Sequence, residues 1–206
     1  DLILICNASN TSKIKNHLDI NSISYEDLTN NTDLIAVQGK TAISIIEEMM
    51  LIPNKFSTSK DSKYTYARTG YTGEDGVEVM LDQKDTLHFI EKLEAKGVMP
   101  CGLGSRDTLR LEASLPLYGF ELTDNITPVE AGLKWTLSNK SDYIGKNVID
   151  EQLSSKNHKY LKKFKLNAKQ IARTGTACKS NNVSGIVTSG NISPILGHPI
   201  GFTLFE

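Results

Sequence analysis

The sequence predicts an α+β protein with a β-rich carboxy-terminal part. Apolar residues recur at helical spacing over residues 41–51 and 86–96, so both segments are expected to form amphipathic helices. Apolar and polar residues alternate over residues 77–81, as they do in a strand with one buried face. From residue 160 onward, short β-type segments are separated by turns rich in asparagine, glycine, serine and proline. Helices in the first part and strands at the end are typical of the α+β class.

The first part of the chain predicts two strands, each followed by a helix. Residues 1–6 contain the apolar run 2–5 and are expected to form a strand, after which Ser9 or Asn10 can cap a short helix. A second strand is predicted for residues 34–37, and the helix at residues 41–51 follows it.

The middle of the chain predicts a hairpin and further helices. Residues 64–68 and 77–81 read as strands joined by a glycine-rich turn. A helix is expected over residues 105–115. The Thr-Pro-Val-Glu run at 127–130 is a capping box with proline at the first helical position, so it predicts another helix start. Residues 138–155 are polar and helix-prone, and are expected to connect two bodies.

The β-rich tail predicts a small barrel or sandwich. Its strand-like segments lie at residues 163–166, 185–188 and 200–204. The chain begins and ends inside apolar runs, and a strand at either end would leave an unpaired edge. We therefore expect these 206 residues to be a fragment of a longer protein.

Composition argues against several classes of protein. The formal net charge of −1 gives no general attraction to nucleic acid or to an anionic membrane. No apolar run approaches the roughly 18 residues that a membrane span needs. The three cysteines and four histidines are scattered without ligand spacing, so we expect neither a metal site nor a disulfide framework.

Glu78 is the first candidate for a binding residue. The alternation in residues 77–81 sends Val77, Val79 and Leu81 to one face of the strand, and Glu78 with Met80 to the other. A carboxylate at this place is either solvated at an edge or directed into a pocket. In a pocket it would suit two adjacent N–H donors on a planar heterocycle, as in pterin and guanine rings.

Tyr71 and Arg106 are further candidates. Tyr71 lies in the glycine-rich turn and is either a lid over the hairpin or an aromatic wall of a binding site. The chain has only four arginines among 23 basic residues, which favours a specific need for a planar, bidentate cation. Arg106 and Arg110 lie four residues apart on one helix face and repel each other, so either a ligand or a structural carboxylate is expected to compensate them.

Trp135 and Asn7 are weaker candidates. Trp135 is the only tryptophan and is either a core residue or part of a ligand site. The Asn7 amide can bond either to the backbone of a turn or to a ligand.

The order of short motifs along the chain resembles the T-protein of the glycine cleavage system, the tetrahydrofolate-dependent aminomethyltransferase. Individually these motifs are moderately specific, and together they form a strong signal. They lie at residues 7–10, 34–39, 68–78, 102–112, 117–119, 127–135, 143–146, 171–175 and 188–194.

The resemblance implies interleaved mixed α/β folate-binding domains followed by a partial carboxy-terminal β-barrel. Residues 1–32 would belong to the second α/β domain, 33–108 to the first, 109–155 to the remainder of the second and a connector, and 156–206 to the incomplete barrel. Metal ligands are not implied.

The resemblance also implies roles for the candidate residues. Glu78 would hold the edge of the pterin, Tyr71 would wall the ring, Arg106 would be a cationic contact, and Asn7 and Trp135 would line the folate site.

The implied reaction passes a methylene group from an aminomethyl group on the lipoylated H-protein to tetrahydrofolate, with release of ammonia. The family's catalytic aspartate falls upstream of residue 1, so this chain alone is expected to be inactive. The protein would act in the cytoplasm of a bacterium, or in the mitochondrial matrix of a eukaryote.

Two alternatives share the folate-binding fold. One is a paralogue that binds folate without transferring a group, as in iron–sulfur assembly, although its Lys-Gly-Cys-Tyr-x-Gly-Gln-Glu signature is absent here. The other is the folate domain of a dimethylglycine or sarcosine dehydrogenase, which a preceding flavin domain would reveal.

Overall fold

The computed structural model describes residues 2–155 and 157–206, and the chain divides into two compact units. The first unit contains the residues up to Gly70 together with Glu74–Pro100. The second contains Tyr71–Gly73 and the residues from Cys101 onward. The glycine-rich turn of the hairpin therefore contributes three residues to the second unit.

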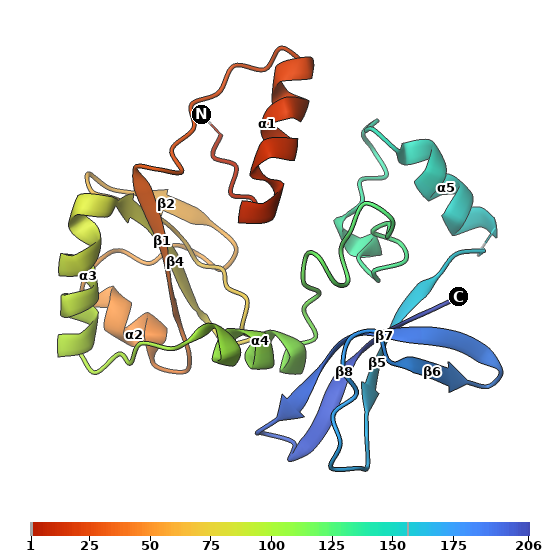
Figure 1. The fold of residues 1–206 in the computed structure, drawn as a ribbon. Coiled ribbons are helices and arrows are strands. Elements are labelled where there is room, and N and C mark those ends of the chain that lie inside the picture. Colours follow the sequence, from red (N-terminus) through yellow and green to blue (C-terminus); the bar gives the residue numbers. More distant parts are fainter. Residues whose placement is uncertain (1, 156) are drawn as a thin grey trace. The chain divides into compact units, whose positions relative to one another are not determined.

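The first unit is a four-stranded antiparallel sheet with two helices packed on one face. Its elements are η1 (Ala8–Asn10), α1 (Thr11–Ile20), β1 (Thr32–Gln38), α2 (Ala42–Glu47), β2 (Thr58–Lys60), β3 (Tyr64–Ala67), β4 (Gly76–Asp82) and α3 (Gln83–Ala95). The strand order is β1-β4-β3-β2, and all three pairings are antiparallel. Figure 1 shows α2 and α3 beside the pair β1 and β4.

The core of the first unit lies between the sheet and these helices. Strand β4 buries Val77, Val79 and Leu81, which pack with Ile46 of α2 and Phe89 of α3. Full burial of side chains of this size contributes about 1.5–3 kcal/mol each. The alternation in β4 thus fixes which face of the sheet packs on the helices.

The predicted hairpin is confirmed, the strand predicted at the start of the chain is wrong, and the helix predicted at residues 41–51 is shorter than expected. Strands β3 and β4 pair in antiparallel register, with Ala67 opposite Glu78. Residues 2–6 form no strand, because a strand needs a ladder partner and none of the described residues pairs with them. Helix α2 is shorter than the expected residues 41–51 and ends at Glu47, followed by turns.

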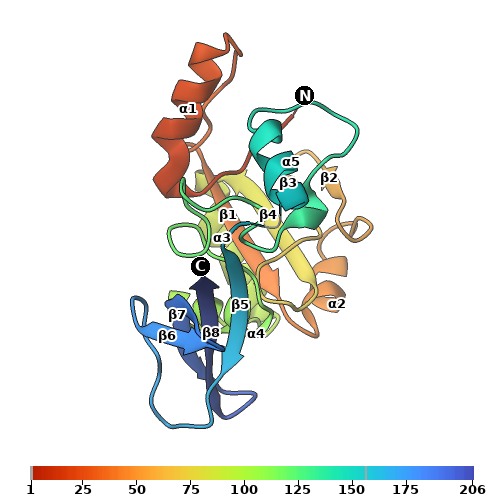
Figure 2. The ribbon, with the colours of Figure 1, turned by 90° about the vertical axis from the view of Figure 1, so that its right-hand side faces the viewer.

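The second unit joins helices and loops to a second four-stranded antiparallel sheet. Its elements are α4 (Leu103–Glu112), η2 (Lys134–Thr136), α5 (Lys146–Ser155), β5 (Tyr160–Lys165), β6 (Ala177–Ser180), β7 (Val183–Ser193) and β8 (His198–Phe205). The strand order is β5-β8-β7-β6, and the strands lie side by side in Figure 2. This sheet is not closed into a barrel within the described residues.

Helix α4 packs against β7 and β8 of this sheet. Leu111 of α4 forms a small core with Ile200 and Phe202 of β8. The polar face of the same helix is also tied to the sheet, because Asn191 donates a hydrogen bond to Thr108 Oγ1 at 3.3 Å.

The capping box at residues 127–130 forms its hydrogen bonds without starting a helix. Glu130 Oε2 accepts from the Thr127 amide at 2.8 Å, and Thr127 Oγ1 accepts from the Glu130 amide at 3.3 Å. Gly132 then takes a positive φ of 75°, which ends the turn. The motif therefore closes a single turn, and the prediction of a helix here is wrong.

No helix within the described ranges is both long and apolar enough to cross a membrane.

Candidate functional site

Glu78 stands on the face of the first sheet opposite the α2–α3 core. Its direct cross-strand neighbours are Ala36 of β1 and Ala67 of β3. Because both neighbours are alanines, the carboxylate is flanked by small side chains and stays only partly buried. Leu34 and Met80 add an apolar surface on the same face, and Leu34 is 43% exposed. A partly buried carboxylate beside apolar side chains can accept N–H donors from a flat polar ring.

Within residues 2–155 and 157–206, one side chain donates a hydrogen bond to the Glu78 carboxylate. Thr69 Oγ1 donates a hydrogen bond to Glu78 Oε2 at 2.6 Å. Thr69 lies just after β3, where the hairpin turn begins. Its carbonyl oxygen accepts from Gln38 Nε2 at 3.0 Å, and the same nitrogen donates to the Val77 carbonyl at 3.2 Å. Gln38, at the end of β1, thus ties the start of the turn, which carries Thr69, to strand β4, which carries Glu78.

Glycines provide the space that the Gln38 side chain occupies. A Cβ atom at Gly70 would lie 1.7 Å from Gln38 Oε1, and one at Gly76 would lie 2.8 Å from Gln38 Nε2. A Cβ at Gly76 would also lie 2.2 Å from the Val37 carbonyl oxygen. Any larger residue at these two positions would displace backbone or the glutamine.

An ion pair closes the base of the same hairpin turn. Arg68 donates from Nε and Nη2 to the two oxygens of Asp75, at 3.2 and 2.7 Å, in a bidentate arrangement. The hydrogen bond from Arg68 lowers the pKa of the Asp75 carboxyl below its ordinary value, and the Gly76 amide adds to the effect. The same hydrogen bond raises the pKa of Arg68.

In the second unit, Tyr71 and Arg106 lie together. The Arg106 guanidinium is centred 4.8 Å from the centroid of the Tyr71 ring, a cation–π distance. The Tyr71 hydroxyl donates to the carbonyl oxygen of Pro116. Burial raises the pKa of Tyr71, while the positive charge of Arg110 opposes that shift. Arg106 itself is exposed, and it forms no ion pair with any of the residues that the structure describes.

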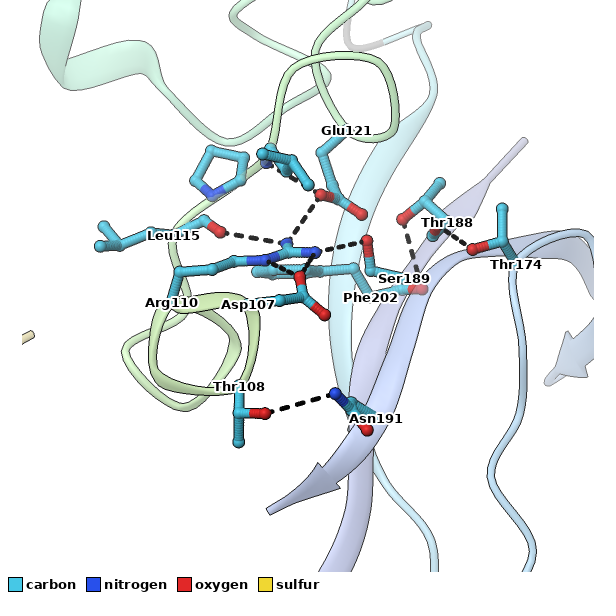
Figure 3. A network of polar contacts seen from close by, with 12 residues as sticks. Asp107, Thr108, Arg110, Leu115, Glu121, Thr174, Thr188, Ser189, Asn191 and Phe202 are labelled. Atoms are coloured by element: carbon cyan, nitrogen blue, oxygen red, sulfur yellow. Dashed lines mark hydrogen bonds and ion pairs between the residues drawn. The ribbon is translucent and has the colours of Figure 1, made fainter. Parts of the chain in front are cut away.

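The neighbouring Arg110 is neutralised by carboxylates of the protein. Its guanidinium bonds to Asp107 at 2.8 Å, to Glu121 at 3.0 Å and to Ser189 Oγ at 3.0 Å (Figure 3). Arg110 is 2% exposed and Glu121 is fully buried. Of the two alternatives for Arg110, the structural carboxylate is correct. For Arg106 the ligand alternative stays a prediction.

The structure leaves the two weaker candidates on the surface. Asn7 is exposed and precedes η1, where its side chain makes no capping hydrogen bond while its carbonyl oxygen accepts from the Asn10 amide at 2.8 Å. Trp135 is 82% exposed, so its interpretation as a core residue is wrong. Contact of either side chain with a ligand stays a prediction.

The candidate residues fall into two groups. Glu78 and Asn7 belong to the first unit, and Tyr71, Arg106 and Trp135 belong to the second. The structure brings Tyr71 and Arg106 together, and their convergence with Glu78 on one ligand stays a prediction. Among the described residues, no three His, Cys, Asp or Glu side chains are grouped so as to hold a metal ion.

Thr69 and Gln38 are not singled out by the sequence. Thr69 lies nine residues from Glu78, and Gln38 lies 31 residues from Thr69. The signal that points to them is indirect: two glycines flank the turn, and neither position has a positive φ that would require glycine. Such glycines indicate that another group approaches the backbone closely.

Comparison with known proteins places the chain in a family. The family described as the GCVT N-terminal domain matches residues 1–141. The aminomethyltransferase of Nostoc sp. is 41% identical over 212 residues, covering 96% of this chain and 56% of that protein. The aminomethyltransferase of Bacillus subtilis is 38% identical over 224 residues, covering 99% of this chain and 62% of that protein.

A solved structure agrees with the sequence relatives. The crystal structure of the glycine cleavage system aminomethyltransferase T from Bartonella henselae matches with a TM-score of 0.86 and 28% identity. The match covers 97% of this chain and 59% of that one. The chain therefore spans a little over half the length of the proteins that it matches. Since the family match extends over residues 1–141 of 206, the chain belongs to the family of the GCVT N-terminal domain.

Proposed function

We propose that the chain acts in a tetrahydrofolate-dependent aminomethyltransferase of the glycine cleavage system. The named relatives support this activity, since each is an aminomethyltransferase and one belongs to the glycine cleavage system. The observation that carries the proposal is the Glu78 carboxylate, which stands between two alanines on the open face of a sheet.

In the proposed reaction, a methylene group moves from the lipoyl arm of an H-protein to tetrahydrofolate. The carbon breaks its bonds to the lipoyl sulfur and to the amino nitrogen, and forms two bonds to folate nitrogens. The thiol and ammonia leave with the displaced protons. The protein's contribution is to hold the folate nitrogen against the incoming carbon and to stabilise a cationic, iminium-like carbon.

Each candidate residue has a chemical role in this proposal. Glu78 accepts two N–H groups from the edge of the pterin, because a carboxylate presents two acceptor oxygens in one plane. Tyr71 provides an aromatic wall, and Arg106 provides a cation for the anionic part of folate. Asn7 and Trp135 contribute further contacts.

The proposal includes the wider organisation of the protein. Residues 1–32 and 109–155 would belong to one α/β domain with its connector, 33–108 to the other, and 156–206 to an incomplete β-barrel. The partner is the lipoylated H-protein, and in a bacterium the site of action is the cytoplasm.

Titration calorimetry with tetrahydrofolate under anaerobic conditions tests the proposal. Glu78→Ala is expected to weaken binding by about 2–5 kcal/mol, because the variant leaves two donors of the ligand without an acceptor. Glu91→Ala is the matched control, since the Glu91 side chain is 63% exposed on α3. Equal affinities for the unaltered chain and Glu78→Ala would remove Glu78 from the site.

A further inference from the structure

Thr69 fixes the orientation of a carboxylate that the sheet alone would leave free. The last torsion of a glutamate is broad, so a Glu78 side chain on an open face could turn its two oxygens in many directions. The 2.6 Å hydrogen bond from Thr69 Oγ1 to Oε2 restricts this rotation. Among the described residues, Thr69 is the hydrogen-bond partner of this carboxylate, and Oε1 accepts no bond.

The backbone of Thr69 is in turn held by Gln38. Gln38 Nε2 donates to the Thr69 carbonyl at 3.0 Å, and it reaches the Val77 carbonyl beside Glu78 at 3.2 Å. The Gln38 side chain has little room to move, because it occupies the space where a Cβ atom at Gly70 or Gly76 would lie. The chain of contacts runs from β1 through Gln38 to Thr69 and ends at Glu78.

We propose that Thr69 and Gln38 are positioning residues that aim the Glu78 carboxylate at a paired N–H edge of a bound heterocycle. This inference rests on the proposed function of Glu78. Thr69 occupies one acceptor site of Oε2, so Oε1 and the remaining site of Oε2 stay available for two donors in one plane. The pair of residues therefore determines selectivity for a ring with an amino group next to a ring N–H.

A purely structural role for Thr69 predicts something different from a positioning role. If the threonine only stabilised the hairpin turn, its loss would weaken the binding of all ligands of the site by the same factor. If it aims the carboxylate, its loss must remove the preference for a ligand that offers both N–H donors. Tetrahydrofolate and its 2-desamino analogue differ in this respect, because the analogue lacks the exocyclic amino group.

The experiment measures the affinity of both ligands for variants of the full chain. Thr69→Val keeps the shape of the side chain and removes the hydroxyl, whereas Thr69→Ser keeps the hydroxyl. We expect Thr69→Val to weaken the binding of tetrahydrofolate roughly tenfold, which corresponds to the loss of one hydrogen bond to a charged group. The analogue should be affected much less, so the ratio of the two affinities should fall. Thr69→Ser should restore that ratio.

Three further variants complete the design. Gln38→Met removes both amide donors at similar length and should lower the same ratio. Thr176→Val, at an exposed position of the second unit, is the control for the loss of a threonine hydroxyl and should leave both affinities unchanged. Thr69→Ala removes the hydroxyl with a smaller side chain, and it replaces Thr69→Val if the valine variant does not unfold cooperatively.

Glu78→Gln distinguishes a failure of the proposed function of Glu78 from a failure of the positioning role of Thr69. If Glu78→Gln leaves the affinity for tetrahydrofolate unchanged, the proposed function of Glu78 is wrong, and the positioning role is wrong with it. If Glu78→Gln weakens binding while the Thr69 variants keep the affinity ratio of the unaltered chain, only the positioning role is overturned. An equal loss of affinity for both ligands in Thr69→Val also overturns the positioning role, because a purely structural residue would affect both ligands equally.

Discussion

Arg110 and Glu121 form an ion pair in the interior of the second unit, with Nη1 3.0 Å from Oε2 and both side chains almost completely buried. The same carboxylate oxygen accepts from the Leu117 amide at 3.0 Å, and Arg110 Nη1 donates to the Leu115 carbonyl at 3.3 Å. The pair thus clamps the loop after α4 onto the helix. That loop also contains Pro116, whose carbonyl oxygen accepts a hydrogen bond from the Tyr71 hydroxyl.

Removal of one partner of this pair should destabilise the protein strongly. We expect Arg110→Met to lower the free energy of unfolding by about 3–5 kcal/mol, because it leaves a buried carboxylate without its counterion. The double variant Arg110→Met with Glu121→Leu should lose less unfolding free energy than Arg110→Met. Urea unfolding measures the free energies of both variants, with Lys146→Met as the control. Lys146 pairs with Asp150 on the surface, and its loss should cost less than about 1 kcal/mol. If Arg110→Met lost as little unfolding free energy as Lys146→Met, the buried ion pair would not hold the loop on the helix.

The stability of the second unit should depend on the ionisation of Tyr71 at high pH. Burial raises the pKa of this tyrosine above its ordinary value of 10.0. The folded state therefore holds the phenolic proton more tightly than the unfolded state, and this contribution is complete below pH 10. It is lost as the pH rises from 10 through the pKa of the folded state. Thermal unfolding should show a smaller decline above pH 10 in Tyr71→Phe than in the unaltered chain, and parallel curves would exclude this contribution.

Two glycines should respond in opposite ways to alanine. Gly76→Ala should destabilise the first unit by about 1–3 kcal/mol, because the new Cβ would meet the Val37 carbonyl oxygen at 2.2 Å. Gly104→Ala, inside α4, meets nothing within 4 Å and should stabilise its helix by about 0.5–1 kcal/mol. Chemical denaturation distinguishes them. An unchanged unfolding free energy for Gly76→Ala would show that the strand ends can separate without cost.

Arg106 should matter for the ligand much more than for stability. The exposed cation–π contact with Tyr71 contributes about 0.5–1 kcal/mol, so Arg106→Lys should unfold almost like the unaltered chain. Its affinity for tetrahydrofolate should fall by about 1.5–3 kcal/mol, since lysine cannot form the planar, charge-assisted fork. Arg173→Lys, at another exposed position of the second unit, is the control. Equal affinities in the two variants would assign Arg106 to the Tyr71 contact alone.

The hairpin shows how much of the fold is encoded locally. The alternation in residues 77–81 is enough to predict β4, its buried face and the opposite orientation of Glu78. The glycine-rich turn predicts its pairing with β3. The short edge strand β2, by contrast, has no apolar alternation and was not predicted, because its formation depends on the neighbour it pairs with.

The capping box shows where local signals mislead. Thr127 and Glu130 make both expected hydrogen bonds, yet Glu130 is buried and its second oxygen accepts from the Lys159 amide at 3.3 Å. The motif serves a tertiary contact, and the chain leaves the turn at Gly132. Capping contributes only about 1 kcal/mol, so it cannot extend a helix that tertiary packing does not support.

The sequence by itself determined the hairpin and the direction of Glu78, because these depend on residue spacing within one element or between neighbours. It also determined the class of fold and the family resemblance, because these depend on the order of elements and motifs along the chain. Only the tertiary structure decided that Arg110 pairs with the Glu121 carboxylate and donates to the Ser189 hydroxyl, 11 and 79 residues away. It also decided that Thr69 bonds to the Glu78 carboxylate and that Gln38 bonds to Thr69. Hydrogen bonds of this kind join side chains that the folded backbone brings together, and periodicity along the chain carries no information about such distant partners.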